Sequence, residues 1–304
     1  MTARYAPAMS SPDAPGPVST QYRDMLARVL AQGEWAPTRQ GPKALTVMQE
    51  SMSFDLADGF PVITERDIRS FWRTPINELA AFMNGVTTVA GLHEFGCGWW
   101  DRWATHDKTS SRGLPDGDLG PGSYGGAFAH FPTLEGGEFD QVTNLVRQIG
   151  ELPELRTHFV SPWIPQLLAR GEGLQSKAVV APCHGWVHVR VIGGRLHLHM
   201  FQRSGDLPVG VPANMIQYSA LALMLSQVTG YEPGRYHHTI SDAHIYEDQV
   251  PQVEVMLARE PRPLPTVTIT DEGRRLTRVQ DFRGEHFELH GYDPHPSMQL
   301  PVAV

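Results

Sequence analysis

The stretch that decides the fold is "WVHVRVIGGRLHLHMFQRS", residues 186–204. Up to residue 192, valines alternate with histidine and arginine. After Gly193-Gly194 the alternation resumes with leucine and methionine as the apolar residues. This pattern predicts two half-buried strands, and the glycine pair predicts a tight turn between them, because glycine readily adopts positive φ. The segment is therefore expected to be a β-hairpin with one buried face.

A long apolar helix is predicted directly after the hairpin, at residues 212–230. Proline is favoured in the first turn of a helix and glycine at its end, as this segment has them. Its most apolar part, residues 215–228, includes the polar residues Gln217, Ser219 and Ser226. It is too short and too polar to span a bilayer, so we expect it to be buried within the protein.

The rest of the chain mixes helical and extended patterns. Helices are predicted at 21–33, 75–85 and 139–152, strands at 45–56 and 157–163, and a long loop at 105–126. Neither an internal repeat nor a long linker is apparent, so residues 20–304 are predicted to form a single mixed α/β domain. Residues 1–19 are rich in proline, alanine and serine, and are predicted to be a disordered tail.

The composition narrows the classes of partner and compartment. The 304 residues suffice for a large core, and 33 acidic against 25 basic residues give a formal charge of −8. This argues against a nucleic-acid surface, although a few arginines still allow a local pocket for a small anion. Two cysteines cannot form a disulfide framework, and the start of the chain lacks a signal-peptide core. We therefore expect a cytoplasmic protein with neither membrane nor nucleic-acid partners.

The motif "APCHGW", residues 181–186, places Cys183 beside His184. A free cysteine is more often a small buried apolar residue than a nucleophile. It becomes nucleophilic where positive charge or hydrogen bonds stabilise the thiolate. Neighbours on a strand point to opposite faces, so His184 need not contact the sulfur, and both interpretations remain open.

The motif "FQRSGDLPVGVPAN", residues 201–214, gathers Arg203, Ser204, Asp206 and Asn214 at the end of the hairpin. Ser204 and Asp206 are equally well explained as turn or capping residues. Arg203 ends an apolar strand, where a guanidinium needs anionic partners, and a phosphate would supply them in bidentate fashion.

Two pairs of residues on predicted strands share a face. His244 and Tyr246, in "SDAHIYED", suit hydrogen bonding to a sugar hydroxyl, although such pairs are more often polar groups within a core. His197 and His199 also share a face, but the sequence supplies no further ligands near them. No metal site is therefore predicted.

In their order along the chain, these motifs resemble the thymidylate synthase family. The match continues with "REPRPLP" and "GYDPHPSMQLPVAV" and extends upstream through "TRQGPKALTV", "INELAAF", "LHEFGCGWWDRW" and "DGDLGPGSYG", so it covers residues 20–304. The resemblance implies a mixed β-sheet with a long buried helix, and a homodimer that packs sheet to sheet. The implied reaction transfers one carbon from methylenetetrahydrofolate, a cosubstrate, to carbon 5 of a pyrimidine nucleoside 5′-monophosphate, without a metal.

The resemblance also assigns roles to individual residues. Cys183 would add to carbon 6 of the base, and Glu78, in "INEL", would act as general acid–base through ordered water. The other residues implied in catalysis are Asp206, Asn214, His184 and Tyr124. The residues implied in nucleotide binding are Arg39, Gln202, Arg203, Ser204, Asn214, His244 and Tyr246, together with Arg156 supplied by the partner subunit. The residues implied in folate binding are Trp100, Trp103, Asp206, Gly210, Ala213, Val302 and Ala303, the last two in a C-terminal tail that closes as a lid.

Several positions depart from the family pattern. Ala213 stands where the family usually has phenylalanine, and the pair Arg156-Thr157 where it has two arginines. Ile240-Ser241 replaces a glycine pair, and Glu65-Arg66 replaces Thr-Lys. Two extra residues lie between Arg66 and Glu78, and the loop at 105–117 is expanded. The small Ala213 would admit water to an exocyclic methylene intermediate, which favours a hydroxymethyl over a methyl product.

These departures suggest a specialised hydroxymethylase, such as the cytidylate hydroxymethylases of nucleoside antibiotic pathways. Asn214 suits uracil, whereas the family's deoxycytidylate hydroxymethylases usually carry aspartate there, so CMP, UMP and dUMP remain open as substrates. The main alternative is a conventional thymidylate synthase that methylates dUMP to dTMP. A Cys–His thiol hydrolase and an inactive nucleotide-binding protein are lesser alternatives.

Overall fold

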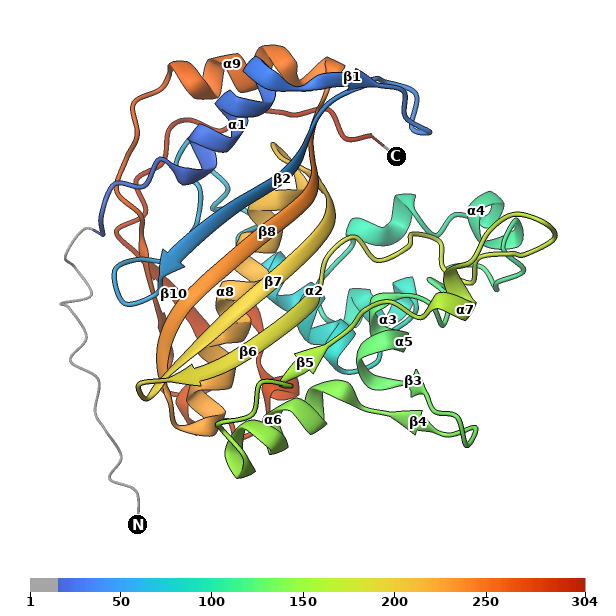
Figure 1. The fold of residues 1–304 in the computed structure, drawn as a ribbon. Helices are drawn as coiled ribbons and strands as arrows, with labels where there is room; N and C mark the ends of the chain where they lie inside the picture. Colours follow the sequence, from blue (N-terminus) through green and yellow to red (C-terminus); the bar gives the residue numbers. More distant parts are fainter. Residues whose placement is uncertain (1–15, 304) are drawn as a thin grey trace.

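The computed structural model describes residues 16–303, which include a six-stranded mixed sheet (Figure 1). Its strand order is β1-β2-β8-β7-β6-β5. The strands are β1 (Glu34–Ala36), β2 (Ala44–Asp55), β5 (Phe159–Val160), β6 (Trp186–Ile192), β7 (Arg195–Asp206) and β8 (Glu232–Tyr246). β7 and β8 are parallel, and the other neighbours are antiparallel.

The predicted hairpin is confirmed as β6 and β7, which pair from Trp186 with Phe201 to Ile192 with Arg195. Gly193 and Gly194 have φ values of 60° and 78°. Positive φ at both turn residues is the geometry that matches the twist of two paired strands, and it explains the two glycines. Along β7 fully buried leucine and methionine alternate with half-buried residues, so one face of the hairpin lies in the core.

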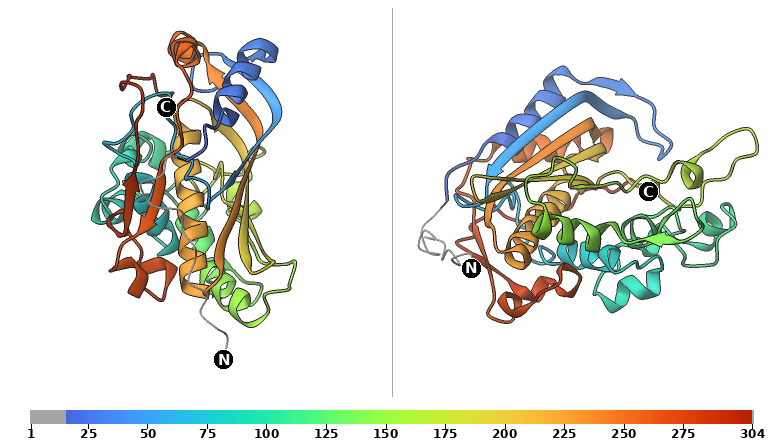
Figure 2. Two further views of the ribbon diagram at one scale, coloured as in Figure 1. Left: turned by 90° about the vertical axis from the view of Figure 1, so that its left-hand side faces the viewer. Right: turned by 60° about the horizontal axis from the view of Figure 1, so that its bottom comes forward.

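Helix α8 (Gly210–Thr229) connects the parallel strands β7 and β8, and begins two residues before the predicted start. Gly230 follows it with φ 77°, and its N–H bonds to the carbonyl of Ser226, a left-handed helix end that glycine adopts at low cost. Apolar residues lie on every side of the helix, together with a few buried polar ones, and most of its residues are buried, as expected for a core helix. Figure 2 shows α8 lying along one face of the sheet. Within residues 16–303, no helix has the length and apolar character needed to cross a membrane.

The remaining elements are shorter helices and two small sheets. The other helices are α1 (Gln21–Gln32), α2 (Thr74–Met83), α3 (Val89–Glu94), α4 (His106–Ser110), α5 (Tyr124–Ala129), α6 (Gln141–Glu151), α7 (Pro165–Leu168) and α9 (Val250–Ala258). Short 3-10 helices lie at Trp99–Arg102, Glu247–Gln249, Gly273–Arg275, Val279–Asp281 and Gly284–His286. Two small sheets pair β3 (Phe131–Pro132) with β4 (Glu138–Phe139) and β9 (Thr266–Ile269) with β10 (Phe287–His290).

The helices and strands predicted from sequence are confirmed with boundary shifts of a few residues. The loop predicted at 105–126 is wrong in part, because α4 lies inside it and α5 begins at Tyr124. These helices have five and six residues, too short to show helical periodicity among so many glycines and prolines. Residues 1–15 of the predicted tail lie outside the described residues. At its end, the carbonyl of Pro17 accepts a hydrogen bond from the N–H of Leu264 (3.1 Å).

Helix α5 packs tightly against the turn after α2. A Cβ atom on Gly125 would lie 2.0 Å from the backbone oxygen of Val86, so no larger residue fits without moving α5. We expect Gly125→Ala to lower the free energy of unfolding by about 2 kcal/mol in denaturant titrations. The control is Gly150→Ala, because Gly150 lies in helix α6 with open space around it. An unchanged stability for Gly125→Ala would contradict this description of the packing.

Candidate active site

Cys183 lies just before β6, beside the end of β7, and is half-buried. The backbone N–H of Arg203 donates to the carbonyl of Cys183 (2.8 Å). The Arg203 guanidinium also donates to the carbonyls of Pro182 (2.7 Å) and Ala181 (2.8 Å), and its Nη2 lies 3.2 Å from the Cys183 Sγ atom. One arginine thus holds the cysteine-bearing segment and places positive charge beside the sulfur.

The electrostatics of the two cysteines differ. Burial raises the pKa of Cys183 above its ordinary value, and the charge of Arg203 opposes that rise. Burial raises the pKa of Cys97 to about 12, and the charges that act on this fully buried second cysteine are those of Glu78 and Asp101. Of the two thiols, Cys183 therefore has the environment in which a thiolate can form.

His184 points away from the sulfur. Its Nδ1 lies 2.7 Å from the hydroxyl of Tyr218, and its ring stacks on Tyr124 with centroids 4.5 Å apart. Burial lowers the pKa of His184 to about 3, so the ring is neutral near pH 7. The Tyr124 hydroxyl accepts the N–H of Cys183 (2.7 Å). The histidine is thus part of the packing behind the cysteine, and a Cys–His hydrolase dyad is not formed.

Glu78 lies on α2, buried between two hydrogen-bond donors. Trp100 Nε1 donates to Oε1 (2.6 Å), and Gln217 Nε2 donates to Oε2 (2.5 Å). Burial raises the pKa of Glu78 to about 7, although both hydrogen bonds favour the ionised form. A carboxyl group with such a pKa can both accept and return a proton near neutral pH.

Buried amides extend from Glu78 into the sheet. Asn214 Nδ2 donates to Gln217 Oε1 (2.9 Å), and Gln202 Nε2 donates to Asn214 Oδ1 (3.0 Å). The Oε1 atom of Gln202 lies 2.8 Å from His238 Nε2. Gln217 and His238 were not predicted from the sequence. Gln217 lies three residues after Asn214, on the same face of α8, which was an available signal.

Polar side chains of β7 and β8 meet on the site side of the sheet. Ser204 Oγ donates to Asp242 Oδ2 (2.9 Å), and His244 Nδ1 lies 3.5 Å from Asp242 Oδ1. The rings of His244 and Tyr246 are 5.1 Å apart, as expected for residues on one face of a strand. Asp242 was not selected from the sequence, and it joins the predicted Ser204 to the predicted His244.

Asp206, at the end of β7, contacts the segment before α8. Its Oδ1 accepts the N–H of Val209 (3.2 Å), and its Oδ2 accepts Gln249 Nε2 (3.1 Å). Gln249 also donates to the carbonyl of Pro301 (3.0 Å), which places the C-terminal segment beside Asp206. Burial raises the pKa of Asp206 to about 6.

The other residues predicted for folate binding occupy several segments. Trp100 is buried between Phe82 and Tyr124. The residues that are partly or largely accessible are Trp103, Gly210, Ala213, Val302 and Ala303. Arg66, one of the departures from the family pattern, is buried and donates to the carbonyl of Pro208 (2.9 Å), so it supports the segment between Asp206 and α8.

Among residues 16–303, neither Arg39 nor Arg156 forms a hydrogen bond with Cys183, whereas Arg203 does. Arg39 lies in an exposed turn between β1 and β2. Arg156 is exposed and lines a hollow on the opposite face of the sheet, together with Phe159, Trp186 and Phe201. The structure therefore gathers the predicted site around Cys183 without these two arginines.

The histidine pair of β7 is engaged in ordinary hydrogen bonds. His197 Nδ1 accepts the N–H of Arg235 (3.1 Å), and His199 Nε2 lies 2.9 Å from the hydroxyl of Thr239. In the part of the chain that the structure describes, no group of three His, Cys, Asp or Glu side chains is arranged to hold a metal.

The site combines a thiol beside a guanidinium, a buried carboxyl group of raised pKa and linked amides, which suits covalent chemistry on a small polar ring. The family model for thymidylate synthase matches residues 20–304. The chain belongs to the thymidylate synthase family. It is therefore an enzyme that transfers a one-carbon group to a pyrimidine nucleotide, and the family takes that carbon from methylenetetrahydrofolate.

Proposed function

We propose that this enzyme hydroxymethylates carbon 5 of a pyrimidine nucleoside 5′-monophosphate, as a specialised member of its family that prepares modified pyrimidines for nucleoside natural products. The observation that carries the proposal is Ala213. This residue lies half-buried in the first turn of α8, next to the buried Asn214. An alanine leaves the volume of an aromatic ring open beside the base, and water can enter that space.

The proposed reaction begins at Cys183. Its thiolate adds to carbon 6 of the base, and the resulting enolate attacks the methylene carbon supplied by methylenetetrahydrofolate. The proton leaves carbon 5, the tetrahydrofolate amine departs, and a methylene group remains on carbon 5. Water then adds to this methylene, and the Cys183 sulfur is eliminated from carbon 6. The net products are the hydroxymethyl nucleotide and tetrahydrofolate, so no reductant is consumed.

The other roles follow from position and charge. Glu78, with its pKa raised to about 7, takes and returns the carbon-5 proton. Arg203 lies beside Cys183 and binds the phosphate with Ser204. Asn214, supported by Gln202, reads the edge of the base. His244 and Tyr246 bind the sugar. Tyr124 and His184 support the cysteine from behind.

The residues on the folate side fit a flat, polar cosubstrate. Trp103 and Gly210 are partly accessible, the Asp206 carboxyl is held by Gln249, and the same glutamine holds the segment leading to Val302 and Ala303. Methylenetetrahydrofolate would supply the one-carbon unit there. The C-terminal residues would close over it and limit the entry of bulk water.

The product distinguishes this proposal from its alternative. Purified protein is incubated with methylenetetrahydrofolate and, separately, dUMP, UMP, dCMP or CMP. Mass spectrometry identifies the nucleotide product, and absorbance follows dihydrofolate. We expect a hydroxymethyl nucleotide without dihydrofolate. Methylation of dUMP with stoichiometric dihydrofolate would instead identify a conventional thymidylate synthase, and binding without any turnover would identify an inactive nucleotide-binding protein.

A substitution at position 213 tests the role of the open volume. We expect Ala213→Phe to exclude water and to shift the product towards the methyl nucleotide by roughly tenfold, with dihydrofolate appearing in proportion. Ala213→Ser is the control, because it adds one oxygen and leaves the space open. An unchanged product ratio in Ala213→Phe would mean that residue 213 does not control water access.

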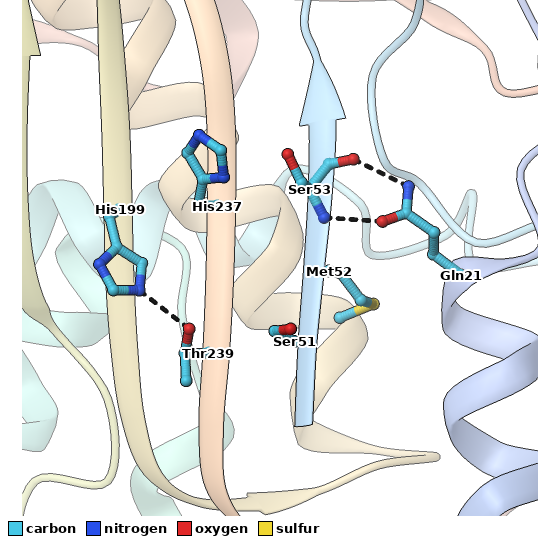
Figure 3. A pocket seen from close by; sticks show the side chains of 7 residues that line it. All are labelled: Gln21, Ser51, Met52, Ser53, His199, His237 and Thr239. Atoms are coloured by element: carbon cyan, nitrogen blue, oxygen red, sulfur yellow. Dashed lines mark hydrogen bonds between the residues drawn. The ribbon is translucent and has the colours of Figure 1, made fainter. Parts of the chain in front are cut away.

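We also propose that the enzyme is a homodimer that packs through the face of the sheet opposite α8. Among residues 16–303, no helix covers β6 and β7 on that side in Figure 2, and Phe159 is about half exposed there (51 %). Figure 3 shows a hollow on the same face, where His199 contacts Thr239 and Gln21 bonds to the backbone of Ser53. A sheet face with aromatic side chains is stabilised by burial, and a second copy would bury it.

This dimer would place Arg156 in the active site of the partner subunit. We expect Arg156→Ala and Cys183→Ala homodimers each to be nearly inactive. Mixing them under conditions that exchange subunits should restore up to about a quarter of the wild-type activity, because half of the dimers then contain one intact site. No recovery, with exchange verified by mass spectrometry, would place Arg156 in its own subunit's site or outside both.

A further inference from the structure

The amide groups around Asn214 form a hydrogen-bonded chain with a fixed direction. Gln202 Nε2 donates to the backbone carbonyl of Ser204 (3.0 Å), which can act only as an acceptor. This fixes which end of the Gln202 amide is nitrogen. Gln202 Oε1 then faces His238 Nε2, so that ring nitrogen carries the proton. Burial lowers the pKa of His238 to about 3, which agrees with a neutral ring.

The orientation of Gln202 also determines the donor and acceptor ends of the Asn214 and Gln217 amides. Gln202 Nε2 meets one end of the Asn214 amide, which must be its oxygen, since two N–H groups would repel each other. The Asn214 nitrogen therefore donates to Gln217 Oε1, and the Gln217 nitrogen donates to Glu78. All three amide side chains are buried, so a reversed amide would leave donors and acceptors without partners.

The consequence concerns the base. In the proposed reaction, carbon 5 of the base faces Glu78. Going around the ring away from Glu78, the next group is the substituent on carbon 4, and N3 follows it. The Asn214 nitrogen lies at the Glu78 end of its amide and the Asn214 oxygen at the Gln202 end. After these bonds, one N–H and one oxygen lone pair remain for the base. They match a 4-oxo group and an N3–H, which uracil has. Cytosine presents a donor and an acceptor in the opposite order.

We infer that Gln217 is a positioning residue that holds the Asn214 amide in the orientation that suits a 4-oxo pyrimidine. Through its two hydrogen bonds, Gln217 also links Asn214, which contacts the base, to Glu78. The inference rests on the proposed roles of Asn214 and Glu78, and it narrows the substrate to a uridine nucleotide. Gln217 bonds Glu78 directly, so base recognition and proton transfer share one side chain.

The pH dependence follows from the groups around Glu78. The titratable side chains that interact electrostatically with it are Cys97 and Tyr218, and burial raises the pKa of both far enough that they stay neutral near pH 7. The neighbouring donors are Trp100 and Gln217. Removing the Gln217 donor disfavours the ionised carboxylate, so the acidic limb of the kcat profile should move to higher pH.

The test compares wild type with Gln217→Met, which keeps an unbranched side chain of similar length but cannot form either hydrogen bond. Gln227→Met, on the same helix but bonded only to the carbonyl of Arg274, is the control. Wild type should prefer UMP or dUMP over CMP or dCMP by roughly a hundredfold or more in kcat/KM. Gln217→Met should lose at least about tenfold of that preference and show the shifted acidic limb, while the control keeps both.

The wild-type protein gives an independent answer if Gln217→Met does not fold. Calorimetry should show tighter binding of UMP or dUMP than of the matching cytidine nucleotide. Equal or tighter binding of the cytidine nucleotide would overturn the inference, as would a Gln217→Met variant with unchanged base preference and pH profile. A methyl product from a uridine nucleotide would refute hydroxymethylation and leave the role of Gln217 standing.

Discussion

We expect Cys183→Ser to lower kcat by at least about four orders of magnitude. Serine is a far weaker nucleophile than cysteine, and the described residues place no general base beside it. His184, the nearest histidine in sequence, is bonded to Tyr218 instead. The serine oxygen retains a hydrogen bond to Arg203, so nucleotide affinity should change little. The measurement is single-turnover kinetics with each candidate nucleotide, together with the nucleotide dissociation constant from calorimetry.

Cys97→Ala supplies the matched control for that experiment. Cys97 is the other cysteine of the chain, and it lies fully buried in the core away from Arg203. Its loss should leave kcat near the wild-type value and at most lower stability slightly. Substantial turnover by Cys183→Ser, within tenfold of wild type, would rule out the cysteine adduct.

Glu78→Gln should lower kcat by roughly a hundred- to ten-thousandfold, the usual contribution of a positioned general acid–base. The amide resembles the carboxylate in shape and remains beside Trp100 and Gln217, but it cannot take a proton. Burial raises the pKa of Glu78 to about 7, so the wild-type kcat should rise with pH through about 7 as the carboxylate forms. The variant should lose this limb.

The pH profile separates this role from a structural one. Glu138→Gln, on the exposed strand β4, should keep the wild-type rate and the acidic limb. If Glu78→Gln were slow but still showed the limb near pH 7, another group would carry the proton, and the assignment of Glu78 would be wrong.

The parts of the fold that could be predicted from sequence are those with strong local patterns. The alternation in β6 and β7, the glycine turn between them and the apolar run of α8 each follow from local chemistry, and all three are confirmed. The short helices α4 and α5 were missed because five or six residues do not establish a period. The parallel pairing of β7 with β8 depends on long-range contacts that no local pattern encodes.

The residues of the candidate site also divide into those that local sequence indicates and those that depend on long-range contacts. Cys183, Arg203 and Asp206 lie in motifs that resemble those of the family, and this resemblance selected them. Gln217 and Asp242 act through partners distant in sequence, since Gln217 meets Glu78 across 139 positions and Asp242 meets Ser204 across 38. Such residues can be identified only from the folded structure, in which the sheet and α8 bring their partners together.

In the proposed reaction, the amides that surround the base are encoded close together, in the unit formed by β7 and α8. Gln202, Asn214 and Gln217 lie within sixteen consecutive residues, yet they link the sheet to Glu78 on another helix. A short stretch of the gene thus encodes these three amides, while separate stretches encode Glu78 and Cys183. Under the proposed roles, changes in a few neighbouring codons would alter base recognition and leave the codons of Glu78 and Cys183 unchanged.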